Sequence, residues 1–163
     1  MTFVAVVALL LTAQVDKPPE PETPSIKPAG LLAASVGTSF QNGVLPTGAM
    51  SLALGLRFAN GIGIVALAHG RIALLPTADG SLQIYGLGAG VRFGERSHVT
   101  IGVSPTVAVF EVPVNPGTRA GVSILAHLVL RIGEYFAVLL QPVIDFTEQA
   151  IIGSATIGAG VTF

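Results

Sequence analysis

The stretch IIGSATIGAGVTF, residues 151–163, alternates between two kinds of side chain. Its odd-numbered positions include Ile151, Ile157, Val161 and Phe163, whereas its even-numbered positions are mostly glycine, serine and threonine. A period of two predicts a β-strand with one apolar face. The closing phrase GAGVTF has a near copy, GAGVRF, at residues 88–93, and related phrases at 54–58 (LGLRF) and 128–132 (LVLRI). The chain therefore repeats one kind of strand.

The composition points to a membrane. Only 10% of the residues are charged and 51% are hydrophobic, whereas soluble domains carry about 25% charged residues. The most apolar long stretch, residues 124–146, is interrupted by charged side chains and a proline, so no run reaches the length of about 18 residues that a spanning helix needs. Because only helices and closed barrels satisfy their backbone groups in lipid, we expect a membrane β-barrel.

Charge and cysteine content exclude several classes of protein. A net charge of −1 gives no basic field for nucleic acid. The absence of cysteine excludes a disulfide framework and a thiol nucleophile.

The first residues predict export. FVAVVALLLTA, residues 3–13, is typical of the core of a secretory signal, although no Lys or Arg precedes it. The alternative is a buried strand or helix. We assign residues 1–13 to a signal peptide, residues 14–29 to a proline-rich periplasmic tether, and residues 30–163 to an outer-membrane barrel.

Eight segments with a period of two follow residue 30, at 31–40, 49–58, 62–73, 82–93, 98–109, 119–132, 136–146 and 150–163. Tight turns at 59–61, 94–97 and 133–135 alternate with mostly longer connections at 41–48, 75–81, 111–118 and 147–149. Short turns at one end and longer loops at the other are typical of outer-membrane barrels. We therefore predict an all-β, eight-stranded antiparallel up-and-down transmembrane barrel with a lumen filled by small and polar side chains. Both termini are expected on the periplasmic side.

The two faces of the strands predict which side meets lipid. In residues 49–58 the larger side chains Met50, Leu52, Leu54 and Leu56 share one face. A soluble, lipocalin-like barrel would turn this face inward, but the opposite face carries too little charge to be wetted. Several apolar residues fall on the inner face and predict a filled lumen, not a water channel: Val65, Leu67, Leu125, Val129 and Leu139.

Aromatic residues fall near the ends of the expected strands and never in their middles. Such a distribution is typical of the two aromatic girdles of outer-membrane barrels. The residues that we assign to the girdles are Phe40, Phe58, Tyr85, Phe93, Phe110, Tyr135, Phe136, Phe146 and Phe163.

With these features, residues 30–163 resemble the small eight-stranded outer-membrane barrels of the OmpA/OmpX type. The terminal GAGVTF is similar to the signal that the assembly machinery of that family reads. The resemblance implies that Val161 and Phe163 form this signal. It implies outer-membrane lipids, the barrel-assembly machinery and periplasmic chaperones as partners, and we expect a monomer. It implies no activity.

Arginine precedes the aromatic or isoleucine residue at the end of three strands, at Arg57, Arg92 and Arg131. All three are expected to point into the lumen near the periplasmic rim. A turn centred near residue 95 would place His98 opposite Arg92, and a loop centred near 114–115 would place His98 opposite Arg131. We therefore predict a polar row in the lumen. It is either an anion-binding basin or a plug hydrogen-bonded to strand carbonyls and turn carboxylates.

No catalytic, metal or cofactor site is expected. Ser51 would lie opposite His69, but Asp145 falls too far along the barrel to orient either. No His, Asp or Glu pair has ligand spacing, and the glycine strings lie inside strands without a following helix. A structural or passive envelope role is favoured. The alternatives are a conduit or carrier for small molecules or lipids, for which Pro105 would mark a lateral seam, and a lipid-modifying enzyme.

Overall fold

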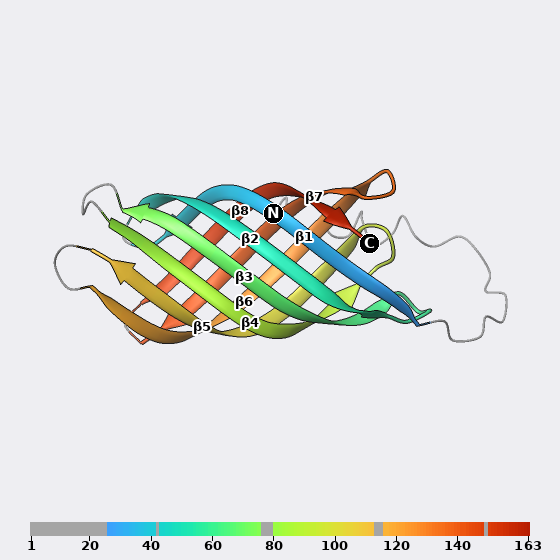
Figure 1. Ribbon diagram of the computed structural model, residues 1–163, viewed down its shortest axis with the longest axis horizontal. Helices are drawn as coiled ribbons and strands as arrows, with labels where there is room; N and C mark the ends of the chain where they lie inside the picture. The colour runs from blue at the N-terminus through green and yellow to red at the C-terminus, as the bar shows by residue number, and fades with distance from the viewer. Residues whose placement is uncertain (1–25, 42, 76–79, 113–115, 149) are drawn as a thin grey trace, which may run out of the picture.

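The computed structural model describes residues 26–41, 43–75, 80–112, 116–148 and 150–163. Its strands, coloured along the chain in Figure 1, are β1 (Lys27–Phe40), β2 (Val44–Arg57), β3 (Ile62–Leu75), β4 (Gly80–Phe93), β5 (His98–Glu111), β6 (Gly117–Ile132), β7 (Phe136–Thr147) and β8 (Ile151–Thr162). No helix among these residues is long and apolar enough to cross a membrane.

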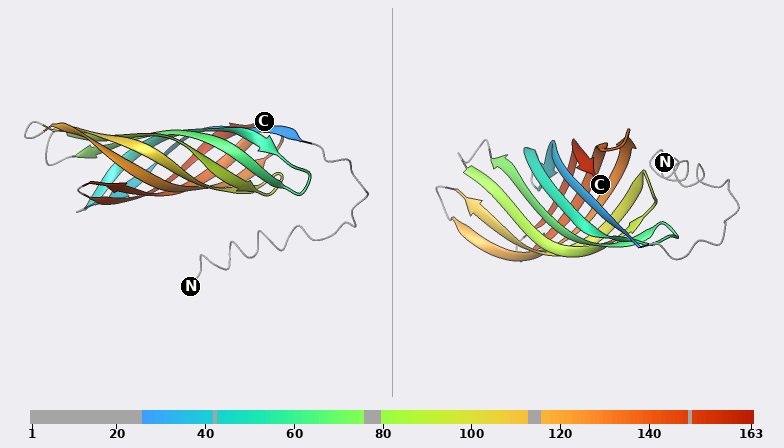
Figure 2. Two further views of the ribbon diagram at one scale, coloured as in Figure 1. Left: turned by 90° about the horizontal axis from the view of Figure 1, so that it is seen from below. Right: turned by 45° about the vertical axis from the view of Figure 1, so that its right-hand side comes forward.

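The eight strands form one closed barrel in which each strand pairs with its neighbours in the sequence and β8 pairs with β1. All pairs are antiparallel. A line drawn through paired residues from Ala29 around the barrel returns to β1 at Ser39, ten residues further along. Such a stagger requires strands that tilt against the barrel axis, as Figure 2 shows. The predicted fold class is confirmed.

The two ends of the barrel differ. At one end, here named the turn end, the chain reverses at Gly61, Gly94 and Gly133, whose φ values of 76°, 105° and 71° favour glycine. Phe163 lies at this end, because its backbone pairs with that of Gly30. The other end, named the loop end, carries the connections at 41–43, 76–79, 112–116 and 148–150. The connections alternate between the two ends as predicted, but the predicted difference in length is wrong. The connections at the turn end have 4, 4 and 3 residues, and those at the loop end have 3, 4, 5 and 3, because the strands extend into the expected loops.

Several strands are longer than predicted. Residues 44–48, expected in a loop, extend β2 and pair with residues 36–40 of β1. Residues 27–29, expected in the tether, begin β1 and pair with residues 55–57 of β2. Pairing continues wherever a neighbouring strand still offers backbone partners. Residues 1–13, expected to be the signal peptide, and residues 14–25 of the expected tether lie outside the described residues.

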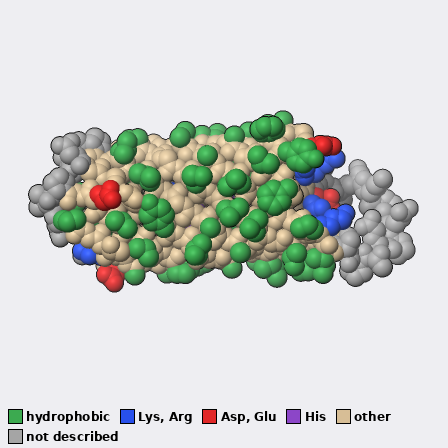
Figure 3. Space-filling model, in the orientation of Figure 1, with side chains coloured by type: hydrophobic (Ala, Val, Ile, Leu, Met, Phe, Trp, Pro, Cys, Tyr) green, Lys and Arg blue, Asp and Glu red, His purple; other side chains and the backbone are tan. Residues whose placement is uncertain are grey.

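The apolar face points outward, as predicted. Met50, Leu54 and Leu56 are exposed on β2, and Ile151, Ile157 and Val161 are exposed on β8. Figure 3 shows hydrophobic side chains spread over the barrel wall, with charged side chains near its two ends. The five inner apolar residues named above are all buried. An apolar exterior is the arrangement that contact with lipid requires.

Exposed aromatic rings lie near both ends of the barrel. Phe93, Tyr135, Phe136 and Phe163 are exposed at the turn end, and Phe40, Tyr85 and Phe146 are exposed in the part nearer the loop end. Phe58 is half-buried and directly precedes a turn. Phe110 differs from the girdle assignment, because it packs partly against buried residues of the lumen. It shares the inward phase of the even-numbered residues of β5, such as Ala108.

Candidate functional site

The lumen is the candidate site, and its polar side chains include two groups at different levels along the barrel. Buried Thr100, His127 and Gln141 lie between these groups, beside apolar side chains. One group lies at the turn end and contains the arginines that the sequence singled out. The other lies between the middle of the barrel and the loop end and contains an ion pair.

The turn-end group contains Arg57, Arg92, His98 and Arg131. Arg92 and His98 are buried, and Arg57 and Arg131 are half-buried. The predicted register between them is wrong, because Arg92 pairs with Thr100 and His98 pairs with Val129. The turn between β4 and β5 and the connection between β5 and β6 are each centred one residue away from the centre that the prediction assumed. A shift of one residue in the centre changes the paired residue by two positions. The side chains share one end of the lumen but do not lie directly opposite one another.

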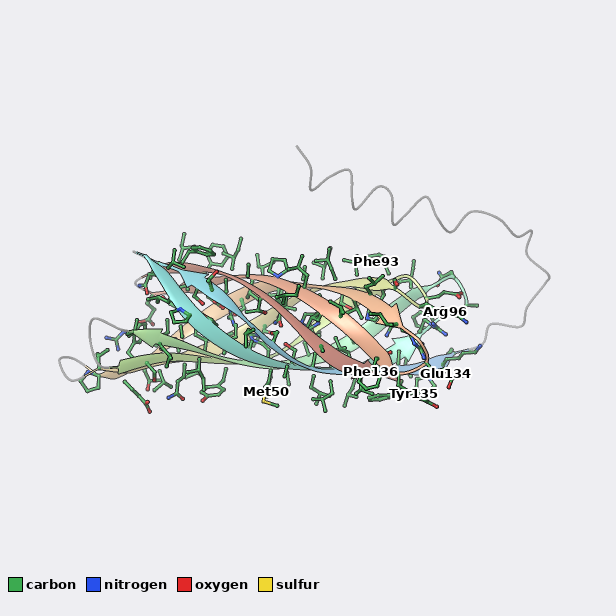
Figure 4. All side chains as sticks on the ribbon, turned by 90° about the horizontal axis from the view of Figure 1, so that it is seen from above. Met50, Phe93, Arg96, Glu134, Tyr135 and Phe136 are labelled. Atoms are coloured by element: carbon green, nitrogen blue, oxygen red, sulfur yellow. The ribbon has the colours of Figure 1, made fainter. Side chains whose placement is uncertain are left out.

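Main-chain carbonyls of the turn at residues 94–97 hold part of this group in place. Arg57 Nη1 and Arg92 Nη2 each donate a hydrogen bond to the carbonyl oxygen of Glu95, at 3.1 Å. His98 Nδ1 lies 3.4 Å from the carbonyl oxygen of Arg96. Arg131 lines an open hollow with Arg96, Glu134 and Tyr135. Figure 4 shows these last three residues together at the turn end.

An apolar plug lies beyond the arginines. It is formed by buried side chains from β1, β2, β3, β6 and β7, and the largest of them are Leu31, Leu67, Leu125 and Leu139. Leu139 has no exposed surface and Leu125 has 1%. This cluster fills part of the lumen between the turn end and the middle, beside the buried side chains of Thr100 and His127.

The second polar group centres on Asp145. Arg71 Nη2 and Ser123 Oγ both donate to Asp145 Oδ1. Arg71 Nη1 also donates to Ser154 Oγ at 3.1 Å, and Ser154 Oγ lies 2.8 Å from Ser39 Oγ. Arg71 is 3% exposed and Asp145 is fully buried. The carboxylate thus compensates a cation that would otherwise stand alone in the lumen.

This ion pair was not predicted from the sequence. The pairing of Ser123 with Asp145 could have been predicted from the turn between β6 and β7. The tight turn at residues 133–135 is centred on residue 134, and equal steps on either side bring Ser123 opposite Asp145, as observed. Arg71 lies on β3, which is not a neighbour of β7. No turn connects those two strands, so a contact across the lumen had no signal in the spacing.

A second apolar cluster closes the loop end. It contains Ala73, Leu82, Ile84, Ala108 and Ile152, and Leu45, Phe110 and Ala150 pack against it. The buried ion pair therefore lies between two apolar clusters.

The residues considered for catalysis do not form a relay. Ser51 pairs with His69 in the register, as expected, but its hydroxyl donates to Gln141 Oε1 at 2.8 Å. Asp145 is engaged by Arg71. Within the part of the chain that the structure describes, neither ring nitrogen of His69 has a hydrogen-bond partner. Among the described residues, no group of three or more His, Asp or Glu side chains is placed to hold a metal ion.

Val161 and Phe163 lie at the end of β8. Both side chains are exposed on the outer surface. The backbone of Phe163 exchanges two hydrogen bonds with Gly30, at 2.7 and 3.2 Å, and its ring lies directly over that glycine. The last residue is thus part of the seam that closes the barrel.

Comparison with known proteins finds similarity in structure but not in sequence. No protein family and no curated protein matches the chain. The crystal structure of Ail, the attachment invasion locus protein of Yersinia pestis, has a TM-score of 0.61 at 15% identity, covering 83% of this chain and 97% of that one. Neisserial surface protein A has a TM-score of 0.56 at 12% identity, covering 85% and 99%. The N-terminal β-barrel domain of Pseudomonas aeruginosa OprF has a TM-score of 0.55 at 14% identity, covering 86% and 100%. The chain shares the barrel fold of these proteins.

Proposed function

We propose that the protein is an integral outer-membrane barrel with a structural or passive envelope role and without catalysis. The observation that carries the proposal is the filling of the lumen by buried side chains. Two apolar clusters stand on either side of a buried ion pair, and a filled barrel of eight strands leaves no aqueous path along its axis.

The proposed location rests on the exterior and on the fold. The outward faces of the strands are apolar, and Ail, Neisserial surface protein A and the N-terminal domain of OprF have the same barrel fold. With the expected signal peptide, this supports export to the outer membrane, with the turn end in the periplasm. We place the chain with the OmpA/OmpX type. Val161 and Phe163 would be read by the barrel-assembly machinery, and the barrel would be a monomer surrounded by lipid.

Conductance measurements test the sealed lumen. Purified protein is reconstituted into planar bilayers, beside a general porin as positive control. The wild type is expected to give no steady channel current. A variant that combines Leu125→Gly and Leu139→Gly, which removes two fully buried leucines of the plug, is the matched control for a weakened seal. Steady wild-type channels of uniform conductance would refute the proposal.

One observation favours a second function, a lipid carrier with a lateral opening. The pairing of β4 with β5 skips two adjacent pairs, Leu87 with Pro105 and Gly88 with Ser104. A groove of about 550 Å³ on this side of the barrel is lined by residues of β1 to β5, including Met50, Gly70, Leu87 and Pro105. The pairing of β6 with β7 also skips two pairs beside Pro142, so Pro142→Val is the control for Pro105→Val in a lipid-transfer assay. Transfer that only Pro105→Val abolishes would favour the carrier.

A further inference from the structure

The turn end of the lumen holds more cationic charge than its own carboxylates balance. Arg57 and Arg131 lie near Arg92 at this end, and Arg96 lines a hollow with Arg131. The acidic residues of the same turns are Glu95 and Glu134. Within the part of the chain that the structure describes, the one ion pair joins Arg71 and Asp145, far from this end. Among the described residues, neither Glu95 nor Glu134 forms an ion pair with these arginines, so the guanidinium charges are not balanced by a paired carboxylate.

The arginines are also incompletely hydrogen-bonded. Arg92 is 6% exposed. Among the described residues, neither its Nε nor the buried Nε of Arg131 has a hydrogen-bond partner. Arg57 and Arg92 share a single acceptor, the carbonyl oxygen of Glu95. Arg57 and Arg131 lie close enough to Arg92 for their charges to repel it. Like charges at the edge of a low-dielectric interior repel more strongly than in water, and an anion among them would relieve this repulsion.

The surroundings form a basin with a closed floor. Buried Val129 and Ala137 belong to the apolar plug. Val129 lies on β6 two residues before Arg131, and Ala137 lies on β7 just after the turn at 133–135. Toward the open side, a hollow of about 570 Å³ is lined by Arg96, Arg131, Gly133, Glu134 and Tyr135. The basin is therefore open toward the turn end and has apolar packing on its inner side.

We propose that this basin binds a phosphate group, with Arg92 and Arg131 as the principal ligands and Arg57 and Arg96 as supporting ones. Each guanidinium offers several N–H donors in a planar fork, and such forks bind phosphate oxygens in pairs. A phosphate group matches several convergent guanidiniums better than a carboxylate does, because it offers more acceptor oxygens. The group could belong to free phosphate or to the headgroup of an anionic phospholipid. The phospholipid source rests on the proposed membrane location.

The test uses full-length mature protein in nanodiscs of zwitterionic phosphatidylcholine. Inorganic phosphate is titrated while NMR follows the Arg Nε–H groups and the backbone amide of His98, with sodium chloride at equal ionic strength as reference. We expect saturable shifts confined to the turn end. Arg131→Gln should weaken binding about tenfold, the equivalent of one charged hydrogen bond. Arg119→Gln is the matched control, because Arg119 lies near the loop end of β6 and donates to the carbonyl oxygen of Thr118.

A second set of nanodiscs contains phosphatidylglycerol. If the same shifts are present before any phosphate is added, and Arg92→Gln removes them, the headgroup is the source. If only free phosphate produces them, the ligand is soluble. Shifts that chloride reproduces, or that Arg92→Gln and Arg131→Gln leave unchanged, would overturn the proposal. Unheated gel mobility checks that each variant is a folded barrel, so a failure to bind is distinct from a failure of the proposed function.

Discussion

Asp145 offers the sharpest test of how the lumen is held together. Its carboxylate accepts from Arg71 and Ser123 and is fully buried. Asp145→Ala would leave the guanidinium of Arg71, 3% exposed, without a counter-charge. Breaking a buried ion pair by removing one partner costs about 3–5 kcal/mol. We therefore expect the free energy of unfolding to fall by about that amount, a large part of the stability of a domain of this size.

The matched variants separate charge from packing. Asp145→Asn keeps the shape of the side chain but removes its charge, so it should show most of the loss. The double variant Arg71→Met with Asp145→Leu removes both charges and leaves mainly the hydroxyl of Ser123 without its acceptor. It should lose only about 1 kcal/mol.

The assay is a urea titration of protein folded into lipid vesicles, with the folded fraction read from the mobility of unheated samples on gels. The account predicts that the double variant is more stable than Asp145→Ala. It would be refuted if the double variant were as unstable as Asp145→Ala, or if Asp145→Asn had the stability of the wild type.

Three further predictions concern β7, β8 and the end of the chain. In the same assay, Leu139→Ala should cost about 2–5 kcal/mol because Leu139 is fully buried in the apolar plug, whereas Leu139→Met should cost less than about 1.5 kcal/mol; equal losses would mean that the plug is loosely packed. Gly158→Ala should destabilise by about 1–3 kcal/mol, because its Cβ would collide with the backbone of Ala34 and Ser35. Gly153→Ala on the same strand has nothing within 4 Å and should be tolerated; a reversed order would contradict the close approach of β8 to β1. Phe163→Ala keeps the backbone bonds to Gly30, so it should lower the amount inserted in cells several-fold while leaving the urea midpoint nearly unchanged; normal insertion would remove the assembly role.

The barrel could be predicted from the sequence because its rules are local. A period of two fixes which side chains share a face, and tight turns such as those at Gly61 and Gly133 fix where neighbouring strands reverse. Even the buried positions of Leu125 and Leu139 follow from phase alone. Phe110 carried the same signal, since it is in phase with Ala108, but its place at the end of a strand suggested the girdle instead.

Details of the lumen needed information that the sequence does not carry locally. The register of β5 against β6 depends on the centre of a long connection, and an error of one residue there separated His98 from Arg131. The contact between Arg71 and Asp145 crosses the lumen between strands that do not pair. It depends on the stagger of the closed barrel, which is a property of all eight strands together.

The central claim is a sealed barrel whose apolar side faces lipid. The most direct measurement separates the membranes of cells that express the full chain on a density gradient and compares unheated with boiled samples on a gel. The account predicts a band in the outer-membrane fraction whose mobility changes on boiling, because the closed barrel resists detergent until it is heated. A single soluble band in the periplasmic fraction, with the same mobility before and after boiling, would contradict it.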